Sequence, residues 1–109
     1  MFIEVEVVCG NVLEAERIAV AAVDNGLAAY AYKFPINSRY PWEGEVKFTE
    51  YETMLVLRTV SENLPDLAVI IEELHSYGKP AIVVKEISYV HHDCYTWVMD
   101  KPADSEKER

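Results

Sequence analysis

The tetrad His91-His92-Asp93-Cys94 contains the densest group of potential metal ligands in this 109-residue chain. In an extended segment, His92 and Cys94 project to the same side, because the side chains of a strand alternate between its two faces. An imidazole paired with a thiolate suits copper or zinc. A stable site needs three or four donors, however, and only two converge here. The tetrad therefore indicates either a metal site completed by other copies of the chain or a solvated segment near its end.

The segment from His75 to Lys79 carries a second set of side chains that could bind a ligand. His75 and Tyr77 flank the break after a predicted helix, and Trp42 lies in an unusual aromatic segment described below. Together with Lys79 they could line a cleft between subunits, in which His75 would donate to a metal ion and Lys79 would attract a small anion. The alternative is structural, with His75 capping carbonyls at the helix end and Tyr77 packing in an interface.

Carboxylates and one further cysteine could also do chemistry. Glu50 and Glu52 lie on one side of a predicted strand, with Glu43 and Glu45 nearby. Paired carboxylates act as acid and base when their environments separate their pKa values, but this strand end is predicted to be exposed, so we expect a solvated face. Cys9 precedes a helix N-terminus, which can lower a thiol pKa, although a buried cysteine is the simpler expectation. The motifs of nucleophilic enzymes and phosphate-binding loops are absent, so we expect a protein that is not an enzyme.

The composition disfavours several classes of partner. Nineteen acidic and ten basic residues give a formal net charge of −9. This balance argues against nucleic acids and anionic membrane surfaces, both of which attract clustered Lys and Arg. No apolar run approaches the roughly 20 residues that span a bilayer, and the first residues lack the basic region of a signal peptide. The two cysteines form no disulfide or ligand pattern, so we expect reduced thiols in a cytoplasmic protein.

Hydrophobic periodicity predicts the order strand, helix, strand, strand, helix, strand. Alternating apolar residues indicate strands, and apolar residues at helical spacing indicate helices. The first helix has a start resembling a capping box at Asn11 and Glu14. The second has Ser61 as a plausible N-cap and Pro65 in its first turn. The expected strands cover residues 2–8, 27–35, 46–60 and 81–87, and the expected helices occupy the intervals between Asn11 and Asp24 and between Ser61 and Leu74.

This order predicts an α+β fold, the ferredoxin-like split βαβ sandwich. Its antiparallel sheet would carry two helices on one face and none on the other. We expect one such domain over residues 1–100, with a short C-terminal element over residues 91–99 that is either helix or strand. Residues 101–109 are nearly all charged, and we expect a disordered tail there.

Aromatic residues indicate that the chain associates with other copies of itself. The segment from Ser38 to Gly44 places Tyr40 and Trp42 in a predicted turn, where small polar residues are usual. Further aromatic residues are available to line the uncovered face or edge of the sheet, namely Tyr30, Tyr32, Phe34, Phe48 and Tyr51. An uncovered, aromatic-rich sheet predicts a closed oligomer.

Four segments follow one another in an order and spacing that resemble the CutA family of divalent-cation-tolerance proteins. They are Leu27-Ala28-Ala29, Ser38-x-Tyr40-x-Trp42-x-Gly44, the run from Leu55 to Thr59, and Leu74-His75-x-Tyr77-x-x-Pro80. The resemblance extends from about Val5 to Ile87. It implies a ferredoxin-like fold and a tight homotrimer whose central hairpin reaches neighbouring subunits. It also implies a non-enzymatic role in tolerance of, or response to, divalent metal ions such as copper.

The chain departs from the family pattern at several positions. The family usually has Cys where this chain has Tyr30, and acidic residues where it has Gly78 and Ala81. The family's C-terminal Tyr-x-x-Trp appears here as Tyr95-Thr96-Trp97, one residue short. The resemblance therefore carries the fold over well, but it does not carry the metal site over intact.

These observations lead to one main hypothesis and two alternatives. The main hypothesis is a homotrimer that binds Cu(II) or another divalent metal ion, with an inter-subunit cleft lined by Trp42, His75, Tyr77 and Lys79. The candidate metal ligands are His75, His92 and Cys94. The first alternative is a module resembling the PII signalling proteins that binds a small anionic ligand, and the second is a purely structural trimer.

Overall fold

The structure is a computed structural model, which describes residues 1–91. Its elements are β1 (Phe2–Cys9), α1 (Val12–Asp24), β2 (Tyr30–Trp42), β3 (Glu45–Val60), the short 3₁₀ helix η1 (Ser61–Asn63), α2 (Leu64–Leu74) and β4 (Ile82–Glu86). The predicted element over residues 91–99 and the charged tail lie outside the described residues, apart from His91. Within residues 1–91, none of the helices is long and apolar enough to cross a membrane.

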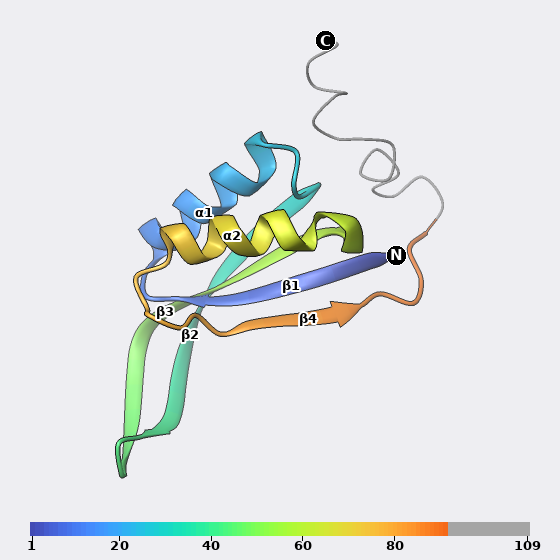
Figure 1. Cartoon of the computed structure of the whole chain (residues 1–109). Coiled ribbons are helices and arrows are strands. Elements are labelled where there is room, and N and C mark those ends of the chain that lie inside the picture. Colours follow the sequence, from blue (N-terminus) through green and yellow to red (C-terminus); the bar gives the residue numbers. More distant parts are fainter. Residues whose placement is uncertain (92–109) are drawn as a thin grey trace.

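The four strands form one antiparallel sheet in the order β2-β3-β1-β4. Both helices lie against the same face of this sheet (Figure 1). Each helix thus connects two strands of one sheet, which is the ferredoxin-like arrangement, and the predicted fold class is confirmed.

One hydrophobic core fills the space between the sheet and the helices. β1 contributes alternate residues to it, since Val5, Val7 and Cys9 are fully buried. The helices contribute Ile18 from α1 and Leu67 from α2, which are also fully buried. Burying each large apolar side chain stabilises the fold by about 1.5–3 kcal/mol. This packing fixes the C-terminal end of β1 relative to both helices.

The start of α1 confirms the predicted capping arrangement. Asn11 is the N-cap, and its Oδ1 accepts a hydrogen bond of 2.9 Å from the N–H of Glu14. The Glu14 side chain turns back and accepts a hydrogen bond of 2.9 Å from the N–H of Gly10, one residue before the cap. Two backbone donors at the helix start are thereby satisfied, and the Glu14 carboxylate is held beside the end of β1.

The predicted N-cap of the second helix is wrong. Ser61 begins the 3₁₀ helix η1, and its hydroxyl contacts the Glu62 carboxylate. α2 starts three residues later, with Pro65 in its first turn as predicted. Its N-cap is Asn63, which makes no side-chain cap and instead donates a hydrogen bond of 3.0 Å to the hydroxyl of Thr59.

The predicted aromatic turn is mostly strand. β2 continues to Trp42, and a turn of two residues, Glu43 and Gly44, joins it to β3. Both turn residues have positive φ, 50° and 80°, as a type I′ hairpin turn requires. Tyr40 and Trp42 are therefore strand residues, paired with Lys47 and Glu45. Aromatic side chains fit the pleated surface of a strand, and the pairing with β3 continues through both residues.

The β2–β3 hairpin extends well beyond the rest of the domain (Figure 1). With the hairpin included, the molecule measures 50 Å along its longest axis. Its pairing shifts register between Ile36 and Ser38. β1 pairs with β3 only as far as Cys9 opposite Thr53, so the hairpin beyond this point has no neighbouring strand within residues 1–91. The hairpin leaves the domain at the place where β1 ends.

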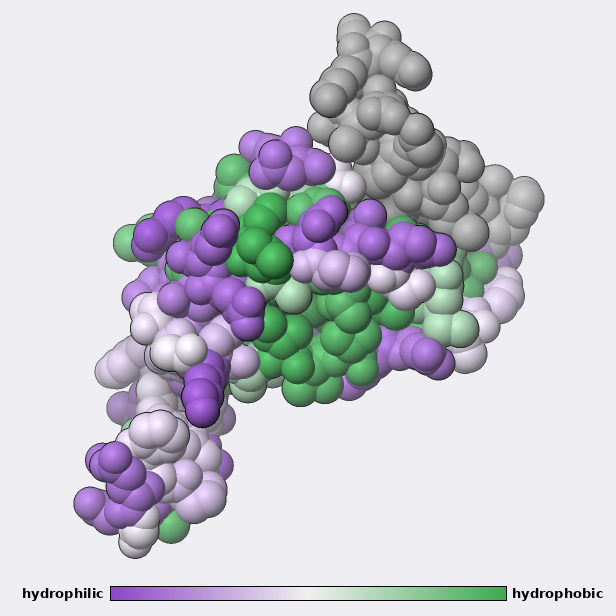
Figure 2. Space-filling view, viewed as in Figure 1, coloured by the Kyte–Doolittle hydropathy of each residue, from purple (hydrophilic) through white to green (hydrophobic). Residues whose placement is uncertain are grey.

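Apolar side chains remain exposed on the face of the sheet that no described helix covers. Tyr30, Tyr32 and Phe34 form a ladder along β2, with ring centroids 6.0 and 6.3 Å apart. Their outer members are 46% and 44% exposed. At the opposite edge, β4 exposes Val83 on this face and Val84, paired with the core residue Val5, on the other, and Figure 2 shows hydrophobic surface over this strand. The predicted uncovered aromatic face is thus present on β2.

Candidate functional site

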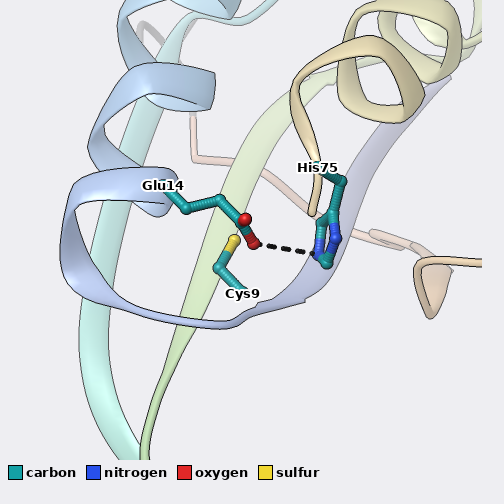
Figure 3. A group of neighbouring side chains, drawn as sticks. All are labelled: Cys9, Glu14 and His75. Carbon is teal, nitrogen blue, oxygen red and sulfur yellow. Dashed lines mark ion pairs between the residues drawn. The ribbon is translucent and has the colours of Figure 1, made fainter. Parts of the chain in front are cut away.

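Three potential metal ligands converge where β1 ends. They are the thiol of Cys9, the carboxylate of Glu14 and the imidazole of His75, and their ligand atoms all lie within 4.8 Å of one another. Cys9 is the last residue of β1, Glu14 lies in the first turn of α1, and His75 follows the last residue of α2 (Figure 3). All three residues are buried. We call this group the Cys9–Glu14–His75 cluster.

His75 uses both ring nitrogens within the fold. Its Nδ1 accepts a hydrogen bond of 3.0 Å from the N–H of Tyr77, so the ring proton resides on Nε2. Nε2 then donates to the carbonyl oxygen of Val8 at 2.7 Å. The same Nε2 lies 3.5 Å from a carboxylate oxygen of Glu14, the contact drawn in Figure 3.

The structural interpretation of His75 needs one correction. The side chain does not cap the carbonyls at the end of α2; it bonds to β1, while the backbone N–H of His75 bonds to Ile71. The side chain of His75 therefore ties the end of α2 to the end of β1.

Glu14 is an ionised buried carboxylate. Burial by itself works to raise the pKa of Glu14, but hydrogen bonds from the Ser76 side chain, from the N–H groups of Gly10 and Ser76, and the nearby His75 together hold the pKa below its usual value. The two backbone bonds are each 2.9 Å long. Three hydrogen bonds to the charged form thus outweigh the cost of burial.

Cys9 is a protonated, unreactive thiol. Burial and the negative charge of Glu14 raise the pKa of Cys9 to about 12. Its Sγ lies 3.8 Å from the carbonyl oxygen of Val7, to which the S–H can donate. The hypothesis that the helix start lowers this pKa is wrong, because the Glu14 carboxylate occupies the helix start and repels a thiolate.

The cluster offers sulfur, oxygen and nitrogen donors, a set that suits zinc or copper. Metal binding here requires the Cys9 proton to leave and a nitrogen of His75 to give up its present hydrogen bond. The sequence indicated His75, but Cys9 and Glu14 were not predicted as its neighbours. The usable signal was the position of Cys9 immediately before the capping motif of α1, which brings both residues to one end of the sheet.

The other predicted site residues lie in different places. Tyr77 contacts His75, with ring centroids 4.7 Å apart at 61°. Lys79 is exposed in the loop before β4. Trp42 is 57% exposed at the tip of the β2–β3 hairpin, so within one chain it does not join the others. The inter-subunit cleft stays a prediction, and the predicted ligands His92 and Cys94 lie outside the described residues.

Glu52 was expected on a solvated face, and that expectation is wrong. Its side chain is only 4% exposed, whereas Glu50 is exposed as expected. The hydroxyl of Tyr77 donates a hydrogen bond to Oε2 of Glu52. Burial, the hydrogen bond to Glu52 and the charge of Glu52 raise the pKa of Tyr77. Tyr77 reaches Glu52 across Gly10, where an added Cβ would lie 3.5 Å from the tyrosine ring.

Comparison with known proteins places this chain among divalent-cation-tolerance proteins. The family model described as CutA1 divalent ion tolerance protein matches residues 3–101. The divalent-cation tolerance protein CutA of Archaeoglobus fulgidus is 32% identical over 85 residues, which cover 78% of this chain and 82% of that protein. The CutA protein of Thermus thermophilus is also 32% identical, over 87 residues that cover 79% of this chain and 84% of that protein.

Solved structures agree with this assignment. The periplasmic divalent cation tolerance protein CutA of Archaeoglobus fulgidus superposes with a TM-score of 0.87 at 28% identity, covering 92% of this chain and 97% of that one. The protein from Thermus thermophilus also gives 0.87, at 29% identity, covering 93% and 98%. Because one of these proteins is called periplasmic, the cytoplasmic location of the present chain stays a prediction. The chain belongs to the CutA1 divalent ion tolerance protein family.

Proposed function

We propose that the protein binds Cu(II) or another divalent metal ion at the Cys9–Glu14–His75 cluster, as part of a non-enzymatic role in divalent-cation tolerance. The observation that supports this proposal is the convergence of three different donor types within 4.8 Å, from three elements of the fold. A thiolate and a carboxylate would together balance the charge of a divalent ion, and the imidazole would complete a borderline-soft donor set.

Uptake of the ion would be coupled to loss of a proton. The Cys9 thiol is protonated in the free protein, and a metal ion binds the thiolate form. His75 would exchange its bond to Val8 or to Tyr77 for a bond to the metal. The energy that binding supplies must cover both rearrangements, so affinity should rise with pH.

A titration with Co(II) and Cu(II), followed by absorption spectroscopy, tests this proposal. Co(II) bound to a thiolate gives a charge-transfer band in the near ultraviolet. We expect one ion per chain in the native protein, loss of the band in Cys9→Ser, and a normal titration in the matched control Cys94→Ser. If the band survives in Cys9→Ser and disappears in Cys94→Ser, the ion binds at the C-terminal tetrad instead.

We further propose that the protein is a homotrimer. The support is the aromatic ladder on the uncovered face of β2, together with the hairpin that projects from the domain. Trp42, at the hairpin tip, can meet His75, Tyr77 and Lys79 only if it comes from another copy, so the predicted cleft requires association. Light scattering measures the mass directly, and a monomer would contradict both the trimer and the cleft.

A structural role is the second candidate for the cluster. It is favoured by the two internal hydrogen bonds of the His75 ring, which leave neither nitrogen free. In that case no divalent ion would bind at stoichiometric amounts, and substitutions in the cluster would lower stability alone.

A further inference from the structure

We propose that Glu52 and Tyr77 form a binding site for a primary alkylammonium group. This site adjoins the Cys9–Glu14–His75 cluster, because the N–H of Tyr77 bonds to His75. Its ligand is an organic cation rather than a metal ion. The proposal goes beyond divalent-cation tolerance and does not depend on it.

The first observation is a buried carboxylate oxygen that lacks a partner. Tyr77 donates its hydroxyl hydrogen to Oε2 of Glu52, but Oε1 accepts no hydrogen bond within the described residues. Glu52 is 4% exposed, so solvent does not readily supply the missing donor. Buried carboxylate oxygens are normally satisfied, and a donor from outside the described chain would satisfy this one.

The second observation is the local charge. Two carboxylates lie close to Tyr77, because its hydroxyl bonds to Glu52 and the N–H of the preceding residue, Ser76, bonds to Glu14. Within residues 1–91, the ion pairs made by Lys and Arg involve other acids, and none reaches Glu14 or Glu52. His75, which does lie beside Glu14, has its ring nitrogens bonded to the N–H of Tyr77 and the carbonyl oxygen of Val8. The surroundings of Glu52 are therefore negative and lack a described counter-charge.

These two observations together define the chemical class of the ligand. The open oxygen needs a hydrogen-bond donor, and the surrounding charge favours a cation, so the group must carry N–H and a positive charge. A metal ion fits poorly, because Glu52 offers one open oxygen and the hydroxyl hydrogen of Tyr77 already occupies the other. Partly exposed tyrosine rings suit an ammonium group, whose positive charge is attracted to an aromatic face.

Two tyrosines provide those rings. Tyr77 is 39% exposed and Tyr40 is 38% exposed. The hydroxyl of Tyr40 contacts that of Thr49 at 3.3 Å, and Thr49 lies three residues before Glu52 on β3. A compact primary ammonium with an alkyl chain can place its charge on Glu52 and its chain along these rings.

Access to Glu52 runs past Tyr77, the exposed member of the pair. The next residue, Gly78, lies in open surroundings, since no atom comes within 4 Å of the place where a Cβ would stand. Its source is either a free alkylamine or a lysine side chain of another copy of this chain.

Titration with n-butylammonium chloride, followed by calorimetry on the full chain, tests the proposal. We expect saturable binding to the native protein, no binding of n-butanol, and weaker binding of tetramethylammonium, which has no N–H. Glu52→Gln should lose affinity by about tenfold or more, because the charge is removed at nearly constant volume. The matched control Glu50→Gln, on the exposed part of the same strand, should bind as the native protein does.

Two further measurements test the proposal if Glu52→Gln does not fold and identify the source of the ligand. On addition of n-butylammonium, the NMR chemical shift of the Glu52 carboxyl carbon in the native protein should change, and an unchanged chemical shift would overturn the proposal. If a lysine of another copy is the natural ligand, n-butylammonium should lower the mass measured by light scattering, and Lys47→Met or Lys79→Met should do the same. Unchanged mass with saturable binding identifies a free amine. Equal binding of n-butanol, or of n-butylammonium to Glu52→Gln, overturns the proposal.

Discussion

The Nε2 atom of His75 lies 2.7 Å from the carbonyl oxygen of Val8, across a sequence separation of 67 residues. This bond joins the end of α2 to the end of β1 at the point where the hairpin leaves the domain. The opposite ring nitrogen holds the N–H of Tyr77, so one imidazole positions both the thiol-bearing strand and the loop that reaches Glu52.

Replacing His75 by Ala should destabilise the fold strongly. The partly buried carbonyl of Val8 would lose its donor, and the N–H of Tyr77 would lose its acceptor. Each unsatisfied buried group costs about 1–3 kcal/mol, so we expect a loss of about 2–4 kcal/mol in the free energy of unfolding. Urea denaturation measures this loss. His91→Ala, at an exposed position, serves as the control and should change stability by less than about 0.5 kcal/mol.

Glu14 should make the protein sensitive to acid. Its pKa in the folded state lies below the ordinary value of 4.5, so its stabilising contribution is present above pH 4.5 and is lost as the pH falls through the folded pKa. Glu14→Gln should have lower stability near neutral pH and a flatter dependence on acid. Denaturation curves recorded from roughly pH 3 to pH 7 compare the two proteins. Parallel curves for both would show that Glu14 does not carry this dependence.

Cys9 should make the stability of the protein sensitive to alkaline pH. Because its pKa rises from 9.0 to about 12 on folding, the unfolded thiol ionises first. The contribution is therefore complete below pH 9.0 and is lost as the pH rises towards 12. Cys9→Ala should remove this part of the alkaline loss. In the native protein, a disulfide reagent should leave Cys9 unmodified near pH 8 until denaturant is added, and rapid labelling of the folded protein at Cys9 would contradict the assignment.

The fold could be predicted from the sequence because its determinants are local. Alternating residues in β1, the capping pair Asn11 and Glu14, and the apolar stripe of α2 each indicate their own element. The order of the elements then leaves few ways to build one sheet. The start of the predicted turn was wrong, because Tyr40 and Trp42 belong to β2, and only the positive φ values at Glu43 and Gly44 show where the chain reverses.

The candidate site was harder to predict because it depends on contacts between distant segments. The burial of Glu52 arises from Tyr77, which lies 25 residues further along the chain and occupies the space beyond the end of β1. The alternation of residues around Glu52 does not indicate that Tyr77 packs over its side chain. His75 was identified from its own segment, whereas its association with Cys9 and Glu14 follows from the way β1, α1 and α2 end at one place.

The backbone conformation of Glu43 is unfavourable for its residue type. Its φ of 50° lies in the left-handed region, which Asn and Gly adopt more cheaply than Glu. Glu43→Asn should therefore raise the free energy of unfolding by about 0.5–1 kcal/mol. Thermal denaturation of the native and substituted proteins measures the gain. Glu45→Gln, a strand position next to the turn, is the control for the lost charge, and an equal gain there would assign the effect to charge instead of backbone conformation.

The uncovered face of the sheet should be the surface through which copies associate. Phe34 is 44% exposed on this face, where it stacks on Tyr32 at 6.3 Å. Phe34→Lys would place a charge against an apolar partner surface, and we expect light scattering to give a lower mass than for the native protein. Val69→Lys is the matched control, because Val69 is 52% exposed on α2, in the helical layer on the other side of the sheet. If Val69→Lys dissociates the protein and Phe34→Lys does not, the copies meet through their helices, and the aromatic ladder must then have another partner.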